Sequence, residues 1–78
     1  MENKEKYTQA FVKSFSVDPA IAQTLAYNEF TAWDSLGHMG LIAEIEEVFG
    51  IQMEMDDIID FSSYQKGIEL LSKYGVSF

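Results

Sequence analysis

The run from about Ser35 to Phe49 constrains the fold of this chain more than any other stretch, because its apolar residues recur at helical spacing and both of its ends are marked. Asp34 and Ser35 are residue types that cap the N-terminus of a helix. Gly50 suits the left-handed conformation in which many helices end. We therefore predict that a helix over about Ser35 to Phe49 is the element around which the rest of the chain packs.

The predicted helix carries two stripes with different surroundings. We assign the first stripe to the core; it consists of Leu41, Ile42, Ile45, Val48 and Phe49. The second stripe is half apolar and half acidic; it consists of Leu36, Met39, Gly40, Ala43, Glu46 and Glu47. A solvated helix face seldom carries Leu and Met at this spacing, although single exposed apolar residues are common. We therefore predict that the second stripe docks to a partner protein.

The acids of this helix favour the docking interpretation. Glu44, Glu46 and Glu47 lie toward its C-terminal end, where the helix dipole makes negative charge unfavourable. None of the three has a Lys or Arg four residues further on, so the helix itself offers them no partner. We expect that they serve another molecule with a basic surface.

Helical spacing also predicts the elements before this helix. A first helix extends from about Lys4 to Phe15, and a short helical turn follows from Pro19 to Leu25. The inward positions of the first helix are Tyr7, Ala10, Phe11 and Phe15. Residues 27–31 form part of a long loop, from which we expect Phe30 to enter the core.

Two further helices are predicted after Gly50. A short acidic helix covers about Glu54 to Phe61, and the last helix runs from about Ser63 to Tyr74. Ser62 and Gln65 form a capping-box pattern at the start of the last helix. Its inward positions are Tyr64, Ile68 and Leu71, and Gly75 ends it. The order of elements predicts an all-α fold, a small four-helix bundle with three major helices, one short helix and a long first loop.

The composition predicts one small domain over residues 1–78. A hydrophobic content of 47% argues for a folded globule rather than a disordered chain. The absence of Cys excludes disulfides and cysteine nucleophiles. The apolar runs are too short to span a bilayer and the first residues do not resemble a signal peptide, so we expect a cytoplasmic monomer.

The net charge of −8 is concentrated in one segment. Residues 34–60 contain eight of the thirteen acids and none of the five lysines, so this segment accounts for the whole net charge. Such a surface repels nucleic acid and anionic lipid and attracts basic protein surfaces. Four of its acids are expected to share a loosely held divalent cation, although they lack the spacing of an EF-hand loop: Glu54, Asp56, Asp57 and Asp60.

The order Trp33-Asp34-Ser35-Leu36, then an apolar helix, then Glu46-Glu47-Val48-Phe49-Gly50-Ile51, resembles the acyl carrier proteins. The resemblance covers nearly the whole chain and is most specific over residues 33–51. In that family the serine of the Asp-Ser-Leu motif carries a 4′-phosphopantetheine arm. The resemblance therefore implies that Ser35 is the attachment site and that Asp34 is the acidic residue before it.

The resemblance also implies how such a chain works. The arm holds acyl groups as thioesters, and a phosphopantetheinyl transferase attaches it from coenzyme A with Mg²⁺. The carrier catalyses nothing itself; acyl-ligating and acyl-transferring enzymes bind it through basic patches. The docking residues implied here are Leu36, Met39, Ala43, Glu46 and Glu47. If the cargo is an apolar acyl chain, we expect it to enter the core just beyond Ser35, with His38 near the entrance.

The motif departs from two better-known patterns. Carriers of primary fatty acid synthesis commonly read Gly-Ala-Asp-Ser-Leu-Asp, whereas this chain has Ala32-Trp33 before the aspartate and Gly37 after the leucine. Peptidyl carriers typically place two Gly and a His or Asp before the serine, and that pattern is absent. The motif fits free-standing carriers of specialised pathways better. The cargo stays open between fatty-acyl, polyketide, aminoacyl and sugar-modifying acyl groups.

Two other interpretations use the same serine. Ser35 could be only a helix cap, which would make the chain an acidic docking module without a prosthetic group. Ser35 could also be a nucleophile activated by His38, three residues further along the helix. No third orienting group is evident for that role, and so small a bundle leaves little room for a substrate cleft. We expect instead that His38 lies at the mouth of the core.

Overall fold

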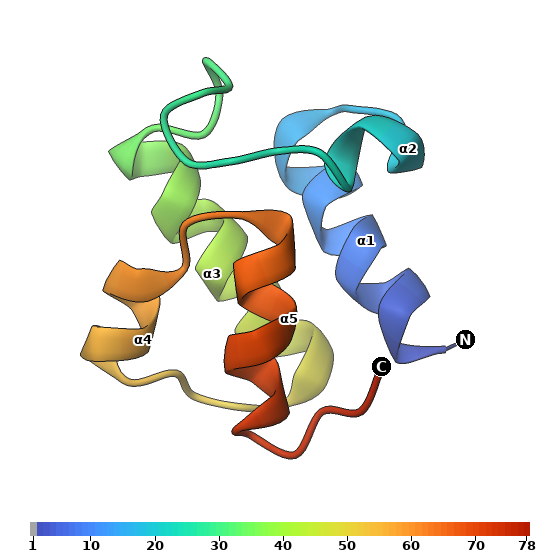
Figure 1. Cartoon of the computed structure of the whole chain (residues 1–78), viewed down its shortest axis with the longest axis vertical. Coiled ribbons are helices and arrows are strands. Elements are labelled where there is room, and N and C mark those ends of the chain that lie inside the picture. Colours follow the sequence, from blue (N-terminus) through green and yellow to red (C-terminus); the bar gives the residue numbers. More distant parts are fainter. Residues whose placement is uncertain (1) are drawn as a thin grey trace.

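The computed structural model describes residues 2–78 as helices joined by loops (Figure 1). The helices are α1 (Asn3–Phe15), α2 (Pro19–Ala22), α3 (Ser35–Phe49), α4 (Met55–Asp60) and α5 (Tyr64–Ser72). Residues 2–78 form no strand, only an isolated antiparallel bridge between Ala26 and Ser63. The predicted all-α class is therefore confirmed, while Met1 of the predicted domain lies outside the described residues. No helix within residues 2–78 has the length and apolar character needed to cross a bilayer.

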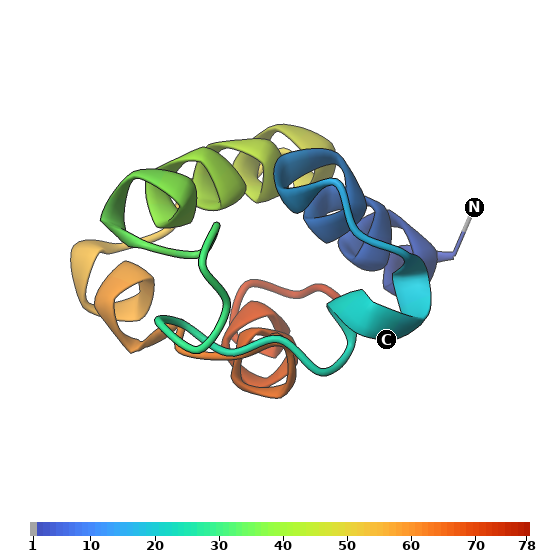
Figure 2. The same ribbon diagram turned by 90° about the horizontal axis from the view of Figure 1, so that it is seen from above.

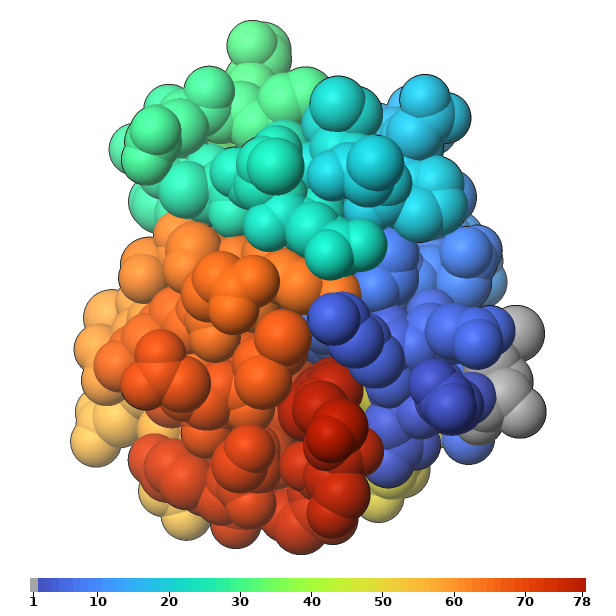
Figure 3. Space-filling view, turned by 45° about the vertical axis from the view of Figure 1, so that its right-hand side comes forward, coloured from blue at the N-terminus to red at the C-terminus, as the bar shows by residue number. Residues whose placement is uncertain are grey.

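The helices surround the core from several sides. α1 and α3 pack side by side, and α5 lies opposite them (Figure 2). α4 lies at one edge of the molecule, next to the first half of α3, and α2 lies at the other edge against α1 (Figures 1 and 2). The long connection between α2 and α3 crosses one end of the molecule above α5 (Figure 3). The first turn of α3 and the whole of α4 therefore border the same edge.

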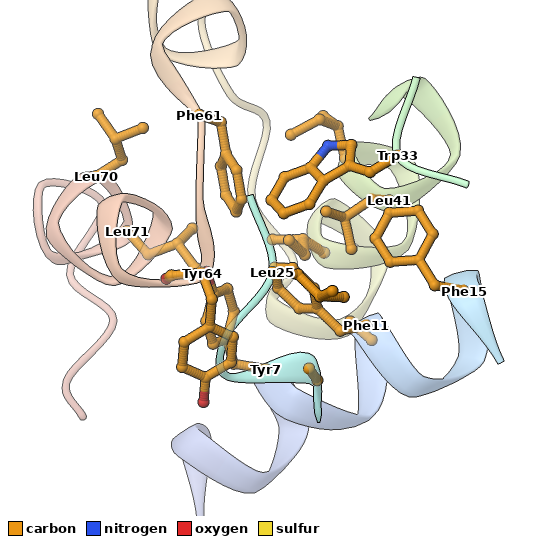
Figure 4. Close-up of a cluster of buried hydrophobic side chains, with 14 of the residues drawn as sticks. Tyr7, Phe11, Phe15, Leu25, Trp33, Leu41, Phe61, Tyr64, Leu70 and Leu71 are labelled. Atoms are coloured by element: carbon orange, nitrogen blue, oxygen red, sulfur yellow. The ribbon is translucent and has the colours of Figure 1, made fainter. Parts of the chain in front are cut away.

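The core is rich in aromatic rings, which come from α1, the long loop and the segment leading into α5 (Figure 4). The buried rings are those of Tyr7, Phe11, Phe15, Trp33, Phe61 and Tyr64. Phe11 meets Trp33 edge to face with ring centroids 5.4 Å apart, a geometry favoured by the ring quadrupoles. Tyr7 is buried without an unpaired polar group, because its hydroxyl donates to the carbonyl of Tyr64 at 2.6 Å.

The predicted core stripe of α3 is confirmed over most of its length. Its fully buried members are Leu41, Ile42 and Ile45. Val48 and Phe49 are only half-buried, because they lie near the end of the helix, where Phe49 meets the exposed ring of Phe78. Gly50 ends the helix in the left-handed conformation with a φ of 64°, as predicted.

Trp33 is the side chain of the long loop that lies deepest in the core, whereas Phe30, which we expected to enter the core, packs against its edge. The indole of Trp33 is fully buried, whereas Phe30 is half-buried and packs against Phe15 with ring centroids 6.0 Å apart. The prediction for Phe30 is therefore only partly right. The ring of Trp33 packs against Phe11 and Phe15 of α1 and is stacked on His38 of α3.

The long loop is fastened to the start of α5. The N–H of Tyr27 donates to the carbonyl of Ser62 at 2.8 Å, and the N–H of Tyr64 donates to the carbonyl of Leu25 at 3.1 Å. These two bonds flank the isolated bridge and hold Tyr27 next to the residues that lead into α5. The long loop is therefore bonded to the rest of the fold at Leu25 and Tyr27.

Two predicted helix boundaries are displaced in the structure. The side chain of Ser63, rather than Ser62, caps α5 by accepting the N–H of Lys66 at 3.0 Å. The predicted capping box of Ser62 with Gln65 is therefore wrong by one residue, because two adjacent serines compete for the cap and backbone geometry decides between them. α2 is also shorter than the predicted turn and ends at Ala22.

Candidate functional site

Ser35 is the first residue of α3, and it is exposed. Asp34 caps this helix: its Oδ1 accepts a hydrogen bond from the N–H of Gly37 at 2.9 Å. The N–H groups of Ser35 and Leu36 have no acceptor within the helix, because no helical carbonyl precedes them. The hydroxyl of Ser35 thus lies at the positive end of the helix dipole, where an anionic ester is favoured.

A groove of about 370 Å³ lies beside Ser35, between α3 and α4. Its lining consists of Tyr27, Ser35, His38, Met39, Met55, Ile58, Ile59, Phe61 and Ser62. Most of these side chains are apolar, and the volume lies in the lower part of the range of ligand sites, about 300–1,000 Å³. The serine hydroxyl therefore borders an apolar surface. A group attached to it could contact that surface directly.

Tyr27 borders the same groove. Its hydroxyl oxygen lies 3.3 Å from the Oγ of Ser35, and its ring meets the ring of His38 edge to face at 5.3 Å. The sequence analysis placed Tyr27 only in a loop. Its role in the groove depends on the backbone bond to Ser62, which no local sequence signal reveals.

His38 joins three parts of the molecule. Its Nδ1 accepts the indole N–H of Trp33 at 2.9 Å, and its Nε2 lies 2.7 Å from the carbonyl oxygen of Ile58 in α4. Because a carbonyl oxygen can only accept, Nε2 carries the ring proton and Nδ1 carries none. His38 is half-buried beside the fully buried Trp33, which agrees with its predicted place at the mouth of the core.

The same bonds determine what this site can do chemically. A nucleophilic serine needs a base within hydrogen-bond reach. Both nitrogens of His38 are occupied by Trp33 and Ile58, and the side-chain partner of the Ser35 hydroxyl is Tyr27. The hydroxyl of Ser35 is therefore exposed and has no bond to His38, and His38 connects Trp33 to α4.

The predicted docking residues lie on the surface with one exception. Leu36 is 83% exposed and Met39 is 55% exposed, and Ala43 and Glu47 are also exposed. Met39 faces the groove, whereas Leu36 lies outside its lining. The stripe therefore separates into a part beside the groove and a part that faces solvent.

Glu46 is the exception, because its carboxylate bonds to another part of the fold. The carboxylate of Glu44 does the same. The Oε2 of Glu46 accepts the backbone N–H of Met53 at 2.8 Å, and Glu46 is only half exposed. Glu44 lies 3.4 Å from the Nζ of Lys13 in α1. The expectation that these acids have no role within the fold is therefore wrong for both, because their partners come from other elements and not from the helix itself.

The surroundings of Asp57 contradict the expectation that four acids in and beside α4 share a divalent cation. Asp57 is only 6% exposed; its carboxylate accepts from the Nζ of Lys73 at 2.7 Å and from the hydroxyl of Tyr74. These hydrogen bonds, from Lys73 first and Tyr74 second, hold the pKa of the Asp57 carboxyl below its usual value against the opposing effect of burial. Within residues 2–78 no three His, Cys, Asp or Glu side chains are grouped to hold a metal.

α4 supplies the groove residues that the sequence analysis missed. Met55 is 71% exposed and Ile59 is 70% exposed, yet both border the groove together with Ile58. Their spacing of three and four residues places them on one helix face, a signal that the sequence does contain. Only the packing of α4 against α3 shows that this face borders the same groove as Met39.

No family model, curated protein or solved structure matches this chain. The basis for a function is therefore the motif around Ser35 and the geometry of the groove. Both are properties of the chain's own residues.

Proposed function

We propose that this chain is an acyl carrier protein with a 4′-phosphopantetheine arm on Ser35. One observation carries the proposal: the serine of Trp33-Asp34-Ser35-Leu36 is exposed on the first residue of an aspartate-capped helix and borders an apolar groove. A serine that served only as a cap would bond a first-turn N–H. In this helix Asp34 performs the capping, which leaves the hydroxyl of Ser35 available.

The residues around Ser35 fit the proposed group. The free first-turn N–H groups and the helix dipole favour the negative charge of a phosphodiester. In the transfer, the Oγ of Ser35 forms a bond to the phosphorus that carries the pantetheine of coenzyme A. The bond from that phosphorus to adenosine 3′,5′-bisphosphate breaks, and the transferase removes the serine proton. The attached arm supplies the thiol on which acyl groups are carried as thioesters, a group that a chain without Cys cannot supply.

The finer fold assignment belongs to the same proposal. α1, α3 and α5 correspond to the three major helices of a carrier-type four-helix bundle, and α4 corresponds to the short one. α2 is then a turn within the long first loop. In this arrangement the attachment serine opens the second major helix.

The exposed side chains around Ser35 support docking of partner enzymes. Leu36, Met39 and Ala43 offer apolar contact, and Glu47 offers an exposed negative charge. The proposed partners are a phosphopantetheinyl transferase and acyl-ligating or acyl-transferring enzymes with basic patches. We place this monomeric carrier in the cytoplasm, in a fatty-acid, polyketide or specialised acyl-transfer pathway, with an aminoacyl or peptidyl cargo as the alternative.

The proposal is tested by measuring the intact mass after incubation with coenzyme A, Mg²⁺ and a phosphopantetheinyl transferase of broad specificity. We expect a gain of one arm on the native chain and none on Ser35→Ala. Asp34 still caps α3 in that variant, so the fold should lose at most about 1 kcal/mol. No gain on the native chain would favour an acidic docking module, and a gain on Ser35→Ala would place the site elsewhere.

A further inference from the structure

We propose that Tyr27 is a positioning residue for the arm: its hydroxyl donates a hydrogen bond to the phosphodiester on Ser35 and holds that phosphate beside the long loop. This inference rests on the proposed attachment at Ser35 and deepens it. It concerns the phosphate through which the arm is attached, and not the acyl group at the other end of the arm.

The first observation is that the backbone around Tyr27 is fixed on both sides. The N–H of Tyr27 donates to the carbonyl of Ser62 at 2.8 Å. The next residue, Asn28, has a φ of 68° and donates its N–H to the carbonyl of Trp33 at 3.0 Å. Asparagine is one of the few residue types that adopt this left-handed conformation readily. The segment between Tyr27 and Trp33 is therefore closed by a backbone bond, which brings Tyr27 close to Ser35.

The second observation is that neighbouring rings orient the side chain of Tyr27. Its ring meets the ring of Trp33 edge to face, with an interplanar angle of 87° and ring centroids 6.5 Å apart. It meets the ring of His38 at an angle of 68° with centroids 5.3 Å apart. His38 is itself held by its hydrogen bonds to Trp33 and Ile58. Because packing sets the direction of the Tyr27 hydroxyl, a hydrogen bond from it costs little side-chain entropy.

The third observation is the bonding state of that hydroxyl. Its oxygen lies 3.3 Å from the Oγ of Ser35, and within residues 2–78 it has no other hydrogen-bond partner. The usual length of an O–H···O bond is about 2.7–2.8 Å, so this contact is a weak one. The Tyr27 hydroxyl therefore lies next to the atom that would be modified, with its donor capacity largely unused.

Attachment of the arm changes the partner that Ser35 offers to Tyr27. In the phosphodiester the Oγ of Ser35 has lost its proton and is bonded to phosphorus, whose unesterified oxygens share a negative charge. Hydrogen bonds to a charged oxygen are shorter and roughly twice as strong as those between neutral groups. Because the Tyr27 hydroxyl is already 3.3 Å from Oγ, rotation about the bonds of Ser35 brings one of these oxygens within its reach. Tyr27 then exchanges a weak bond for a charge-assisted one.

The surroundings of Ser35 offer no cationic side chain for this role. Among the described residues that line the groove there is no lysine, and residues 34–60 contain none. The ring N–H of His38 is already donated to Ile58, and the carboxylate of Asp34 can only accept. The side-chain donor adjacent to Oγ is therefore the neutral hydroxyl of Tyr27.

The main test compares Tyr27→Phe with the native protein, each without the arm and with the arm attached. The substitution keeps the ring and removes only the hydroxyl. We expect it to lower the melting temperature of the arm-bearing form more than that of the bare form. A coupling of about three- to tenfold between hydroxyl and arm corresponds to a difference of roughly 3–11 °C between the two losses. Equal losses in the two forms would overturn the inference.

Tyr74→Phe is the matched control. It makes the same change at a tyrosine that lies outside the lining of the groove and whose hydroxyl bonds Asp57 and the N–H of Glu54. This variant should lower the melting temperature of the bare and arm-bearing forms equally. If the arm-bearing form of Tyr74→Phe also lost more, the coupling would not be specific to Tyr27, and the inference would be overturned.

The phosphorus NMR resonance of the arm gives a readout that does not depend on stability. The resonance of the native arm-bearing protein should shift in Tyr27→Phe, and its relaxation should report a more mobile phosphate. Tyr74→Phe should leave both unchanged. No change in Tyr27→Phe would mean that the first-turn N–H groups of α3 hold the phosphate alone, which would overturn the role of Tyr27.

The intact mass separates failure of the two proposals. A native chain that gains no arm on Ser35 would overturn the proposed function together with this inference. A chain that gains the arm but shows neither the coupling nor the shift of the phosphorus resonance would overturn this inference alone.

Discussion

Gly37 is one of the positions at which the motif departs from the common carrier pattern, and its surroundings give a reason. A Cβ built at Gly37 would lie 2.0 Å from the carbonyl oxygen of Ala32 and 3.3 Å from the ring of Phe15. The N–H of the same residue donates to Asp34. Any side chain at this position would therefore push the end of the long loop away from the first turn of α3, where Ser35 lies.

We predict that Gly37→Ala destabilises the protein by about 1–3 kcal/mol, because the contact is with backbone that cannot move freely. Gly40→Ala is the matched control on the same helix, since nothing lies within 4 Å of its Cβ position. The control should stabilise by about 0.5–1 kcal/mol through helix propensity. Urea unfolding of both variants tests the pair; a stable Gly37→Ala would show that the loop yields.

Asp57 gives a second prediction for a single residue, with a defined pH dependence. Its pKa is lowered in the folded state by Lys73 and Tyr74, so its ionised form stabilises the fold above the pKa of an unfolded aspartate, about 3.9. That contribution is lost as the pH falls through the folded pKa. Asp57→Asn should therefore melt below the native protein at pH 7, and the difference should shrink below about pH 4.

Asp56→Asn serves as the control for that experiment, because Asp56 is the exposed neighbour on the same short helix. Its melting temperature should follow the native protein at every pH. If Asp57→Asn also follows the native protein, the bonds from Lys73 and Tyr74 contribute nothing to the stability of the fold.

At the scale of the elements, the acids of α3 divide into two kinds. Glu46 bonds the backbone of Met53 beyond the end of its helix, while Glu47 is exposed. We predict that Glu46→Lys destabilises by about 1.5–3 kcal/mol, because a hydrogen bond to a charged group is lost. Glu47→Lys should change stability by less than about 0.5 kcal/mol.

The rate of arm attachment tests the docking role of Glu47 separately from stability. Under the proposed function, Glu47→Lys should lower the kcat/KM of arm attachment several-fold, since it reverses charge on the docking surface. Glu69→Lys makes the same change on the exposed face of α5 and should have little effect. Equal rates for both variants and the native protein would mean that Glu47 takes no part in docking.

The positions of the helices were predictable, and the groove was not. Periodicity and capping are local signals, so α1, α3, α4 and α5 were placed within a few residues of their observed ends. The partner of Glu46 lies after the turn that ends α3, and the floor of the groove joins His38 to α4. Such contacts depend on how the helices pack against one another. A helical pattern in the sequence indicates only which face of a helix is apolar. The same limit explains why Trp33 was not assigned to the core.

At the scale of the whole molecule, the distribution of charge opposes folding. The chain carries a net charge of −8, and its acids gather in residues 34–60. Among residues 2–78, ion pairs join Lys13 to Glu44 and Lys73 to Asp57 and no others. Most of the acids in that segment are therefore free to repel one another, and this repulsion works against the compact state.

We predict from this balance that salt acts in opposite directions on fold and on docking. At about 0.15 M ionic strength the Debye length is roughly 8 Å, so added NaCl should raise the melting temperature by screening neighbouring surface acids. The same screening should slow arm attachment by a basic transferase, measured at constant Mg²⁺. The carboxylate of Asp57 is hydrogen-bonded to Lys73 and Tyr74. Mg²⁺ should therefore raise the melting temperature no more than NaCl of equal ionic strength. A larger effect of Mg²⁺ would reveal a cation site formed by the remaining acids of α4, and a melting temperature that falls with salt would show that attraction between paired charges outweighs the repulsion.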